Sequence, residues 1–186
     1  MSKTALLHLL PLFVMLSIAA VSDLRSRKIR NWLTFSLVLT GLAQSFTAAH
    51  TVPPMASFLG LAAGFGLTFL LFAMGALGGG DVKLLAGVGA WVGPMPVLAV
   101  FCLAAVAGMV IVLAQALWQG RLRQLLHNSA LVAVNIAHVS ELGVAHATAT
   151  GKSCRSVDRP LPYAVPVLLG VAALVATSLL GHGVGG

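Results

Sequence analysis

Two aspartates are the strongest candidates for chemistry in this chain, because each lies where an apolar segment meets a polar stretch. Asp23 follows the apolar run 5–22, and Asp81 follows the glycine cluster 78–80. The pair is half of the four acidic residues in a chain of which only 8% is charged. Carboxylates at membrane depth cost free energy unless they are paired or hydrated, so they indicate a functional site. Two carboxylates that meet across a helix bundle could activate a water molecule by acid–base catalysis.

The composition places these aspartates in a membrane protein. Hydrophobic residues make up 59% of the 186 residues, and the mean hydropathy is +1.00, outside the range of soluble domains. The two cysteines form no CxxC pair, and the six histidines are too scattered to suggest a metal site. We expect one integral-membrane domain over residues 1–186, without a metal or other cofactor.

Six apolar segments predict an all-α, polytopic membrane helix bundle. They cover residues 5–22, 32–49, 55–77, 82–92, 95–118 and 161–180. Most of them have, or approach, the ~20 residues that a spanning helix needs. The fourth is too short to cross a hydrocarbon core of ~30 Å at ~1.5 Å per residue. We therefore expect about six transmembrane helices, of which the fourth is short.

The basic residues determine the predicted orientation. With the N-terminus outside the cytoplasm, only Lys3 lies outside. The cytoplasmic side then receives the other basic residues: Arg25, Arg27, Lys28, Arg30, Lys83, Arg121, Arg123, Lys152, Arg155 and Arg159. This distribution follows the positive-inside rule, and it explains the net charge of +7 without nucleic-acid binding. Both aspartates are predicted on the cytoplasmic side.

Residues 119–160 are expected to form a cytoplasmic loop with an interfacial helix. Hydrophobic residues recur at roughly helical spacing in 120–145, whereas Asn135, His138 and Glu141 disfavour a spanning segment. We expect an amphipathic helix on the membrane surface, followed by a loop of small residues at 146–156. Whether the helix also contacts a substrate stays open.

Three motifs resemble those of prepilin peptidases, a group of G-x-G-D membrane aspartyl proteases. Gly78-x-Gly80-Asp81 resembles the G-x-G-D signature, and residues 23–31 (DLRSRKIRN) resemble the first-aspartate motif. Arg30 stands where proline is usual in the Ile-Pro-Asn part of that motif. Residues 159–166 (RPLPYAVP) resemble the Pro-Tyr segment that opens the last helix of these proteins. The three motifs occur in order and extend over nearly the whole chain.

The resemblance implies an aspartic endopeptidase that removes the leader peptide from prepilins or pseudopilins. It places this activity at the cytoplasmic face of the bacterial inner membrane, in a multi-pass protein with a periplasmic N-terminus. The similarity is to the short forms associated with Flp/Tad-type pili, which lack the methyltransferase region with paired CxxC motifs. We therefore expect cleavage without N-methylation. The expected partners are the precursor and the lipid bilayer, without nucleic acid, and the oligomeric state stays open.

The resemblance also assigns roles to particular residues. Asp23 and Asp81 are implied to share one proton and to hydrolyse a peptide bond through a water molecule. The residues expected to bind substrate or shape the site are Gly78, Gly80, Lys83, Asn31, Pro162 and Tyr163. The ends of the predicted helices favour an ionised Asp81, at a helix N-terminus, and a protonated Asp23, at a helix C-terminus.

Structural alternatives exist for most of these residues when they are considered one at a time. Asp23 could be an interfacial carboxylate neutralised by Arg25 or Arg27, and Asp81 could be a helix N-cap. Lys83 could be a positive-inside anchor, and Tyr163 could belong to an interfacial aromatic belt. The glycines outside the motif are expected at close helix contacts: Gly87, Gly89 and Gly108.

Two other classes of function are compatible with buried acidic residues. A small proton-coupled transporter would place charges nearer to the middle of its helices and would show matched discontinuous segments in two halves. This chain has one glycine break and no internal repeat, which disfavours the transporter. A non-enzymatic pilus-assembly subunit is the third class, and only an activity measurement distinguishes it from the peptidase.

Overall fold

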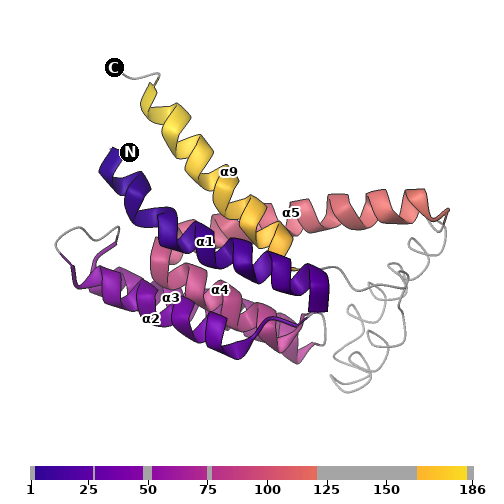
Figure 1. Ribbon diagram of the computed structural model, residues 1–186, viewed down its shortest axis with the longest axis horizontal. Helices are drawn as coiled ribbons and strands as arrows, with labels where there is room; N and C mark the ends of the chain where they lie inside the picture. Colours follow the sequence, from indigo (N-terminus) through magenta and orange to yellow (C-terminus); the bar gives the residue numbers. More distant parts are fainter. Residues whose placement is uncertain (1–2, 27, 48–51, 75–76, 121–162, 184–186) are drawn as a thin grey trace, which may run out of the picture.

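The computed structural model describes residues 3–26, 28–47, 52–74, 77–120 and 163–183, which form helices and no strand (Figure 1). The helices are α1 (Lys3–Ser26), α2 (Asn31–Ser45), α3 (Pro54–Ala73), α4 (Gly79–Val92), α5 (Pro94–Trp118) and α9 (Ala164–Gly183). The predicted all-α bundle is therefore confirmed. The predicted interfacial helix at 120–145, the loop at 146–156 and Pro162 lie outside the described residues.

Three of the described helices are long and apolar enough to cross a membrane. They are His8–Ser26 within α1, α3 and α5. By contrast, α2 has 15 residues and α4 has 14, so at ~1.5 Å per residue both are shorter than a hydrocarbon core of ~30 Å. The short fourth helix was predicted, whereas the second helix is shorter than the predicted segment 32–49.

Proline and glycine determine several helix boundaries. Pro54 and Pro94 occupy the first positions of α3 and α5, where the missing N–H has no intrahelical partner to lose. Between α4 and α5, Gly93 has a φ of 88°, a left-handed conformation that residues with a Cβ rarely adopt. This glycine ends α4 and reverses the chain direction.

α4 is the central helix of the bundle. It packs most extensively against α3 and α2, and it also contacts α1, α5 and α9. Every residue of α4 from Val82 to Trp91 is buried except Lys83. A short helix buried all round is therefore what positions the residues at its own N-terminus, including Asp81.

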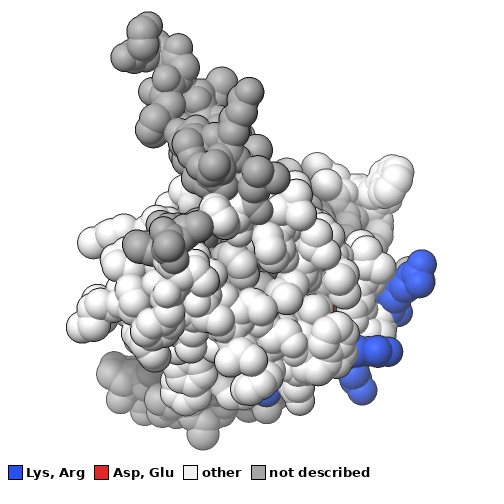
Figure 2. Space-filling view, turned by 60° about the vertical axis from the view of Figure 1, so that its left-hand side comes forward, with Lys and Arg blue, Asp and Glu red and all other residues white. Residues whose placement is uncertain are grey.

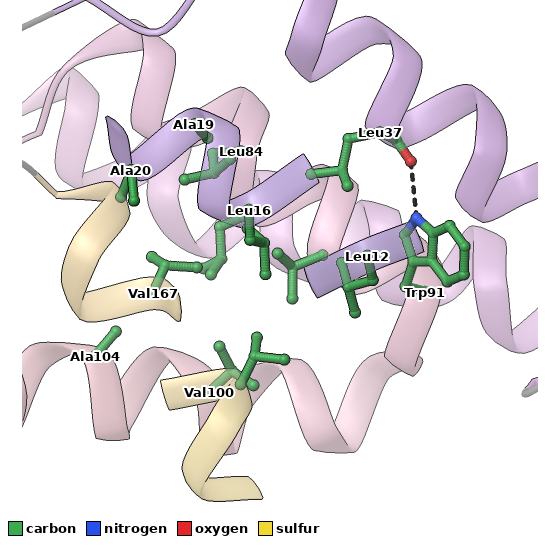
Figure 3. Packing of buried hydrophobic residues seen from close by; sticks show 14 of the residues in the cluster. Leu12, Leu16, Ala19, Ala20, Leu37, Leu84, Trp91, Val100, Ala104 and Val167 are labelled. Atoms are coloured by element: carbon green, nitrogen blue, oxygen red, sulfur yellow. Dashed lines mark hydrogen bonds between the residues drawn. The ribbon is translucent and has the colours of Figure 1, made fainter. Parts of the chain in front are cut away.

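Side chains from five helices form one hydrophobic core. Leu12 and Leu16 of α1 lie beside Leu84 of α4, Val100 of α5 and Val167 of α9 (Figure 3). At the edge of this core, the indole Nε1 of Trp91 donates a hydrogen bond of 3.1 Å to the carbonyl oxygen of Leu37 (Figure 3). The core fixes α1 and α9 against α4, which matters because the candidate site draws on all three helices.

Glycines allow α2, α3 and α4 to approach closely. A Cβ on Gly60 of α3 or on Gly89 of α4 would overlap the carbonyl oxygen of the other residue. A Cβ on Gly87 would lie 2.8 Å from the side chain of Leu37 on α2. Small residues at such crossings are typical of membrane helix packing. The close contacts predicted for Gly87 and Gly89 are confirmed, and the one for Gly108 stays a prediction.

Candidate active site

Asp23 lies in the last turn of α1 and is nearly inaccessible, with 7% of its surface exposed. Its Oδ2 accepts a hydrogen bond of 3.1 Å from the backbone N–H of Ala164, the first residue of α9. The first N–H groups of a helix have no intrahelical acceptor, so a carboxylate is a favourable partner for them. Asp23 therefore joins the end of α1 to the start of α9.

Asp81 lies in the first turn of α4 and is half-buried. Its Oδ2 accepts a hydrogen bond of 3.0 Å from the backbone N–H of Gly78, the N-cap residue. A Cβ on Gly78 would lie 3.1 Å from that same oxygen, so the glycine leaves room for the carboxylate. Asp81 is therefore the third residue of α4 and not the N-cap that the structural alternative predicted; its bond back to Gly78 holds the carboxylate in place.

The chain between α1 and α2 folds back over the end of α1. The hydroxyl groups of Ser22 and Ser26 each donate a hydrogen bond to the carbonyl oxygen of Lys28, at 3.2 and 3.3 Å. The next residue, Ile29, is half-buried, and a Cβ on Gly80 would lie 3.3 Å from its Cβ. The chain after Asp23 therefore rests on the helix turn that carries Asp81, and Gly80 permits this close approach.

The two carboxyl groups interact electrostatically. Burial raises the pKa of Asp81 to about 6, the hydrogen bond from Gly78 opposes this rise, and the charge of Asp23 adds to it. Like charges disfavour simultaneous ionisation, which is the condition for two carboxyl groups to share a proton. The structure thus brings the two predicted catalytic residues into one electrostatic unit at the end of the bundle.

Tyr163 precedes α9, and its phenol interacts electrostatically with Asp81. It is half-buried, its neighbour Ala164 donates to Asp23, and its own carbonyl oxygen accepts the N–H of Val167. Burial raises the pKa of Tyr163 to about 12, and the charge of Asp81 adds to this rise. The phenol therefore stays protonated at physiological pH and can act only as a neutral hydrogen-bonding group there.

Asn31 and Lys83 form a separate pair. Lys83 Nζ donates a hydrogen bond of 3.1 Å to Asn31 Oδ1, at an exposed position between α2 and α4. Lys83 follows Asp81 by two positions, and residues at i and i+2 of a helix do not face each other. The structure therefore brings Asn31 and Lys83 together, but on a different side of α4 from Asp81.

Basic side chains gather at the end of the bundle that carries both aspartates. Figure 2 shows most of the Lys and Arg side chains visible from this direction at its right-hand edge, with one small blue area near the bottom. The exposed basic residues of the described chain at this end are Arg25, Lys28, Arg30 and Lys83. The cytoplasmic orientation predicted for both aspartates rests on the same residues.

Two observations bear on which of the two aspartates holds the shared proton. In the sequence, Asp23 is expected only at the C-terminus of a helix. In the structure it also accepts a hydrogen bond from an N–H at the N-terminus of α9. In addition, burial and the charge of Asp23 raise the pKa of Asp81. The raised pKa makes Asp81 a candidate proton donor, so the assignment drawn from the helix ends stays a prediction and the reverse assignment is the one proposed below.

Two contributors to the site were absent from the sequence predictions. The first is Ala164, which acts through its backbone N–H, so its side-chain type carries no signal. The second is Ile29, which contacts the helix turn of Asp81 through Gly80. Its place in the motif that follows Asp23 was a signal, but its contact could not be assigned without the packing.

The fold and the site define a helical membrane protein with two interacting carboxyl groups at one end of its bundle. The sequence profile of the type IV leader peptidase family matches residues 10–113. This match covers more than half of the chain and includes both aspartates. The chain belongs to the type IV leader peptidase family.

Two curated proteins are similar to part of the chain. The preflagellin peptidase of Methanococcus voltae is 35% identical over 79 residues, which are 40% of this chain and 34% of that protein. The preflagellin peptidase of Methanocaldococcus jannaschii is 38% identical over 79 residues, 40% of this chain and 33% of that protein. The matched region thus spans about a third of the length of these relatives. No solved structure gives a significant match.

Proposed function

We propose that this protein is a membrane aspartic endopeptidase that removes the leader peptide from a prepilin. The observation that carries the proposal is the pair of interacting aspartates, Asp23 and Asp81, each oriented by a backbone N–H at the start of a helix. Two fixed, interacting carboxyl groups, one with a raised pKa, suit general acid–base hydrolysis.

In the proposed mechanism, Asp23 is the general base and Asp81 the general acid. Asp23 removes a proton from a water molecule, whose oxygen attacks the scissile carbonyl carbon, while Asp81 donates its proton to the carbonyl oxygen. When the tetrahedral intermediate collapses, the C–N bond breaks. The proton held by Asp23 then passes to the leaving amine, and Asp81 recovers its proton from the hydroxyl group. Tyr163, a neutral phenol that interacts electrostatically with Asp81, is proposed to orient one of the reacting groups.

The proposed substrate rests on the names of two similar proteins, and the proposed side of the membrane rests on the basic residues. Prepilins carry a short basic leader before an apolar helix in the family that this chain resembles, and two similar proteins are named preflagellin peptidases. We propose a prepilin or pseudopilin of the Flp type as the substrate, cleaved at the cytoplasmic face of the bacterial inner membrane. The basic residues at the same end as both aspartates support this orientation.

We further propose that this chain cleaves without methylating the new N-terminus. The short forms that this chain resembles lack the methyltransferase region with its paired CxxC motifs, and the two cysteines of this chain form no such motif. Mass spectrometry of mature pilin from a host that carries only this enzyme is expected to show an unmodified terminal amine. Methyl transfer by the purified chain would contradict this proposal.

Co-expression with a candidate prepilin tests the proposed function. Asp23→Asn and Asp81→Asn are each expected to leave the precursor at full length while the variant remains inserted and monodisperse in detergent. Asp158→Asn makes the same change at an aspartate outside the motif and is the matched control, expected to process the precursor normally. Processing at near wild-type rate by either motif variant would exclude the aspartic mechanism. A wild-type chain that processes no prepilin would favour the assembly subunit or the transporter.

A further inference from the structure

A cavity of about 400 Å³ lies between α2, α3 and α4. Its walls are mainly apolar and include Phe35, Val38, Leu61 and Phe65. This volume is within the range of ~300–1,000 Å³ that small-molecule sites have. Phe35 and Phe65 are 68% and 45% exposed, so two of the phenyl groups in these walls also lie on the outer surface of the bundle. In a membrane, that surface contacts lipid.

The cavity has a polar end formed by Asn31 and Lys83. Lys83 Nζ donates to Asn31 Oδ1, a neutral acceptor that does not compensate the positive charge. In the part of the chain that the structure describes, no ion pair is found for Lys83. The amide nitrogen of Asn31 is a further donor. An apolar cavity with an ammonium group and an amide N–H donor at one end fits an amphipathic anion.

The position of the cavity separates it from the carboxylate pair. Lys83 and Asp81 are two positions apart on α4, so their side chains leave the helix in different directions. Asp81 interacts with Asp23 and Tyr163, whereas Lys83 contacts α2. A ligand at Lys83 would therefore lie on another side of α4 from the reaction centre.

The charge of the bundle end favours a lipid as the ligand. Arg25, Lys28 and Arg30 are exposed in the chain segment that leads to Asn31. The only acidic residues among the described ones are Asp23 and Asp81. Basic pockets between membrane helices on the cytoplasmic side are known sites for anionic headgroups. Because α2 and α4 are shorter than the hydrocarbon core, a headgroup beside them can reach the level of Lys83.

We propose that the cavity between α2, α3 and α4 binds an anionic phospholipid. Its phosphate group contacts Lys83 Nζ and the side-chain amide of Asn31, and part of one acyl chain enters between Phe35 and Phe65. The bound lipid fills the gap between α2 and α3 at the end of the bundle that carries the carboxylate pair. This site is a property of the folded chain and does not depend on the proposed peptidase activity.

Lipid binding to the purified full chain tests this proposal without any substrate. Native mass spectrometry in detergent would compare dioleoyl phosphatidylglycerol with dioleoyl phosphatidylcholine, and the wild type is expected to prefer the anionic lipid. Lys83→Gln is expected to weaken phosphatidylglycerol binding about fivefold, the value of roughly one charge contact with an anionic surface. Lys28→Gln removes the same charge at the same end outside the cavity, and it is expected to change the affinity less than about twofold.

A second variant keeps the proposal falsifiable if Lys83→Gln does not fold. Val38→Trp fills the cavity without changing the charge, and it is expected to abolish the preference for phosphatidylglycerol. Equal binding of both lipids by the wild type, or an equal effect of Lys28→Gln and Lys83→Gln, would overturn the proposal. Competition by inorganic phosphate as effective as that by phosphatidylglycerol would show that no acyl chain is bound. Displacement of the lipid by an apolar prepilin helix at one-to-one stoichiometry would assign the cavity to the substrate instead.

Discussion

Asp23 and Ala164 are 141 positions apart in the chain, and a hydrogen bond of 3.1 Å joins the carboxylate of one to the backbone N–H of the other. This bond connects the first described helix to the last at the end of the bundle where the reaction is proposed. Asp81 makes the equivalent bond to Gly78 within a single helix turn. Each aspartate is therefore held by a helix N-terminus, but only the one at Asp23 depends on the packing of distant segments.

The bond between Asp23 and Ala164 predicts the effect of a proline at position 164. Ala164→Pro removes the N–H donor, whereas a proline at the first position of a helix is well tolerated. A hydrogen bond to a charged group contributes about 1.5–3 kcal/mol, so cleavage is expected to slow roughly tenfold to a hundredfold. Steady-state cleavage of a fluorescent leader peptide measures this. Ala164→Gly keeps the donor and is the control; equal losses in both variants would mean that the bond has no role.

The raised pKa of Asp81 predicts the pH dependence of cleavage. In the proposed mechanism Asp81 must be protonated, and its pKa is raised from 3.8 to about 6. The protonated fraction is therefore high below pH 6 and is lost as the pH rises through this value. We expect kcat/KM to fall above pH 6, approaching about tenfold per pH unit. A rate that increases with pH between 6 and 8 would instead assign the base to Asp81.

The interaction between the two carboxyl groups predicts a change in the pKa of one when the other is neutralised. The charge of Asp23 contributes to the raised pKa of Asp81, so Asp23→Asn is expected to lower the pKa of Asp81. Infrared titration of the protonated carboxyl band in this variant measures the shift without needing activity. An unchanged or higher pKa of Asp81 would show that the two groups do not interact as the structure indicates.

The glycine cluster before Asp81 predicts a difference between neighbouring substitutions. A Cβ at Gly78 would lie 3.1 Å from Asp81 Oδ2, whereas a Cβ at Gly79 would make an ordinary contact of 3.6 Å with Phe72. Gly78→Ala is therefore expected to displace the carboxylate and to lower kcat about tenfold or more. Gly79→Ala is the matched control and should stay within about twofold. Cleavage rates at equal folded-protein concentration compare them, and equal rates would contradict the positioning role of Gly78.

The contact between α3 and α4 predicts which glycines stabilise the bundle. Gly89→Ala introduces a methyl group against the carbonyl oxygen of Gly60 and is expected to lower the free energy of unfolding by about 1–3 kcal/mol. At Gly66, on the same helix as Gly60, a Cβ would meet nothing within 4 Å. Gly66→Ala is expected to be neutral or to stabilise the helix by up to about 1 kcal/mol. Unfolding in mixed detergent micelles measures both; a Gly89→Ala variant as stable as the wild type would contradict the close packing.

The sequence alone determined the helical class, the approximate positions of the six helices and the two aspartates at their ends. It could do so because these features are local. A run of apolar residues determines transfer into lipid, and the polar Asp81 directly after the glycine cluster 78–80 indicates the start of a helix. The short fourth helix followed from the same count of apolar residues before Gly93.

Only the tertiary structure decided which parts of the chain meet at the site. Three features of the structure join segments that are distant in the chain. They are the hydrogen bond from Ala164 to Asp23, the contact of Ile29 with Gly80, and the cavity between α2, α3 and α4. Helices that are apolar on every side carry little periodicity to indicate which face packs inward. Their rotation is set by side-chain packing and close glycine contacts, and these exist only once the helices have assembled.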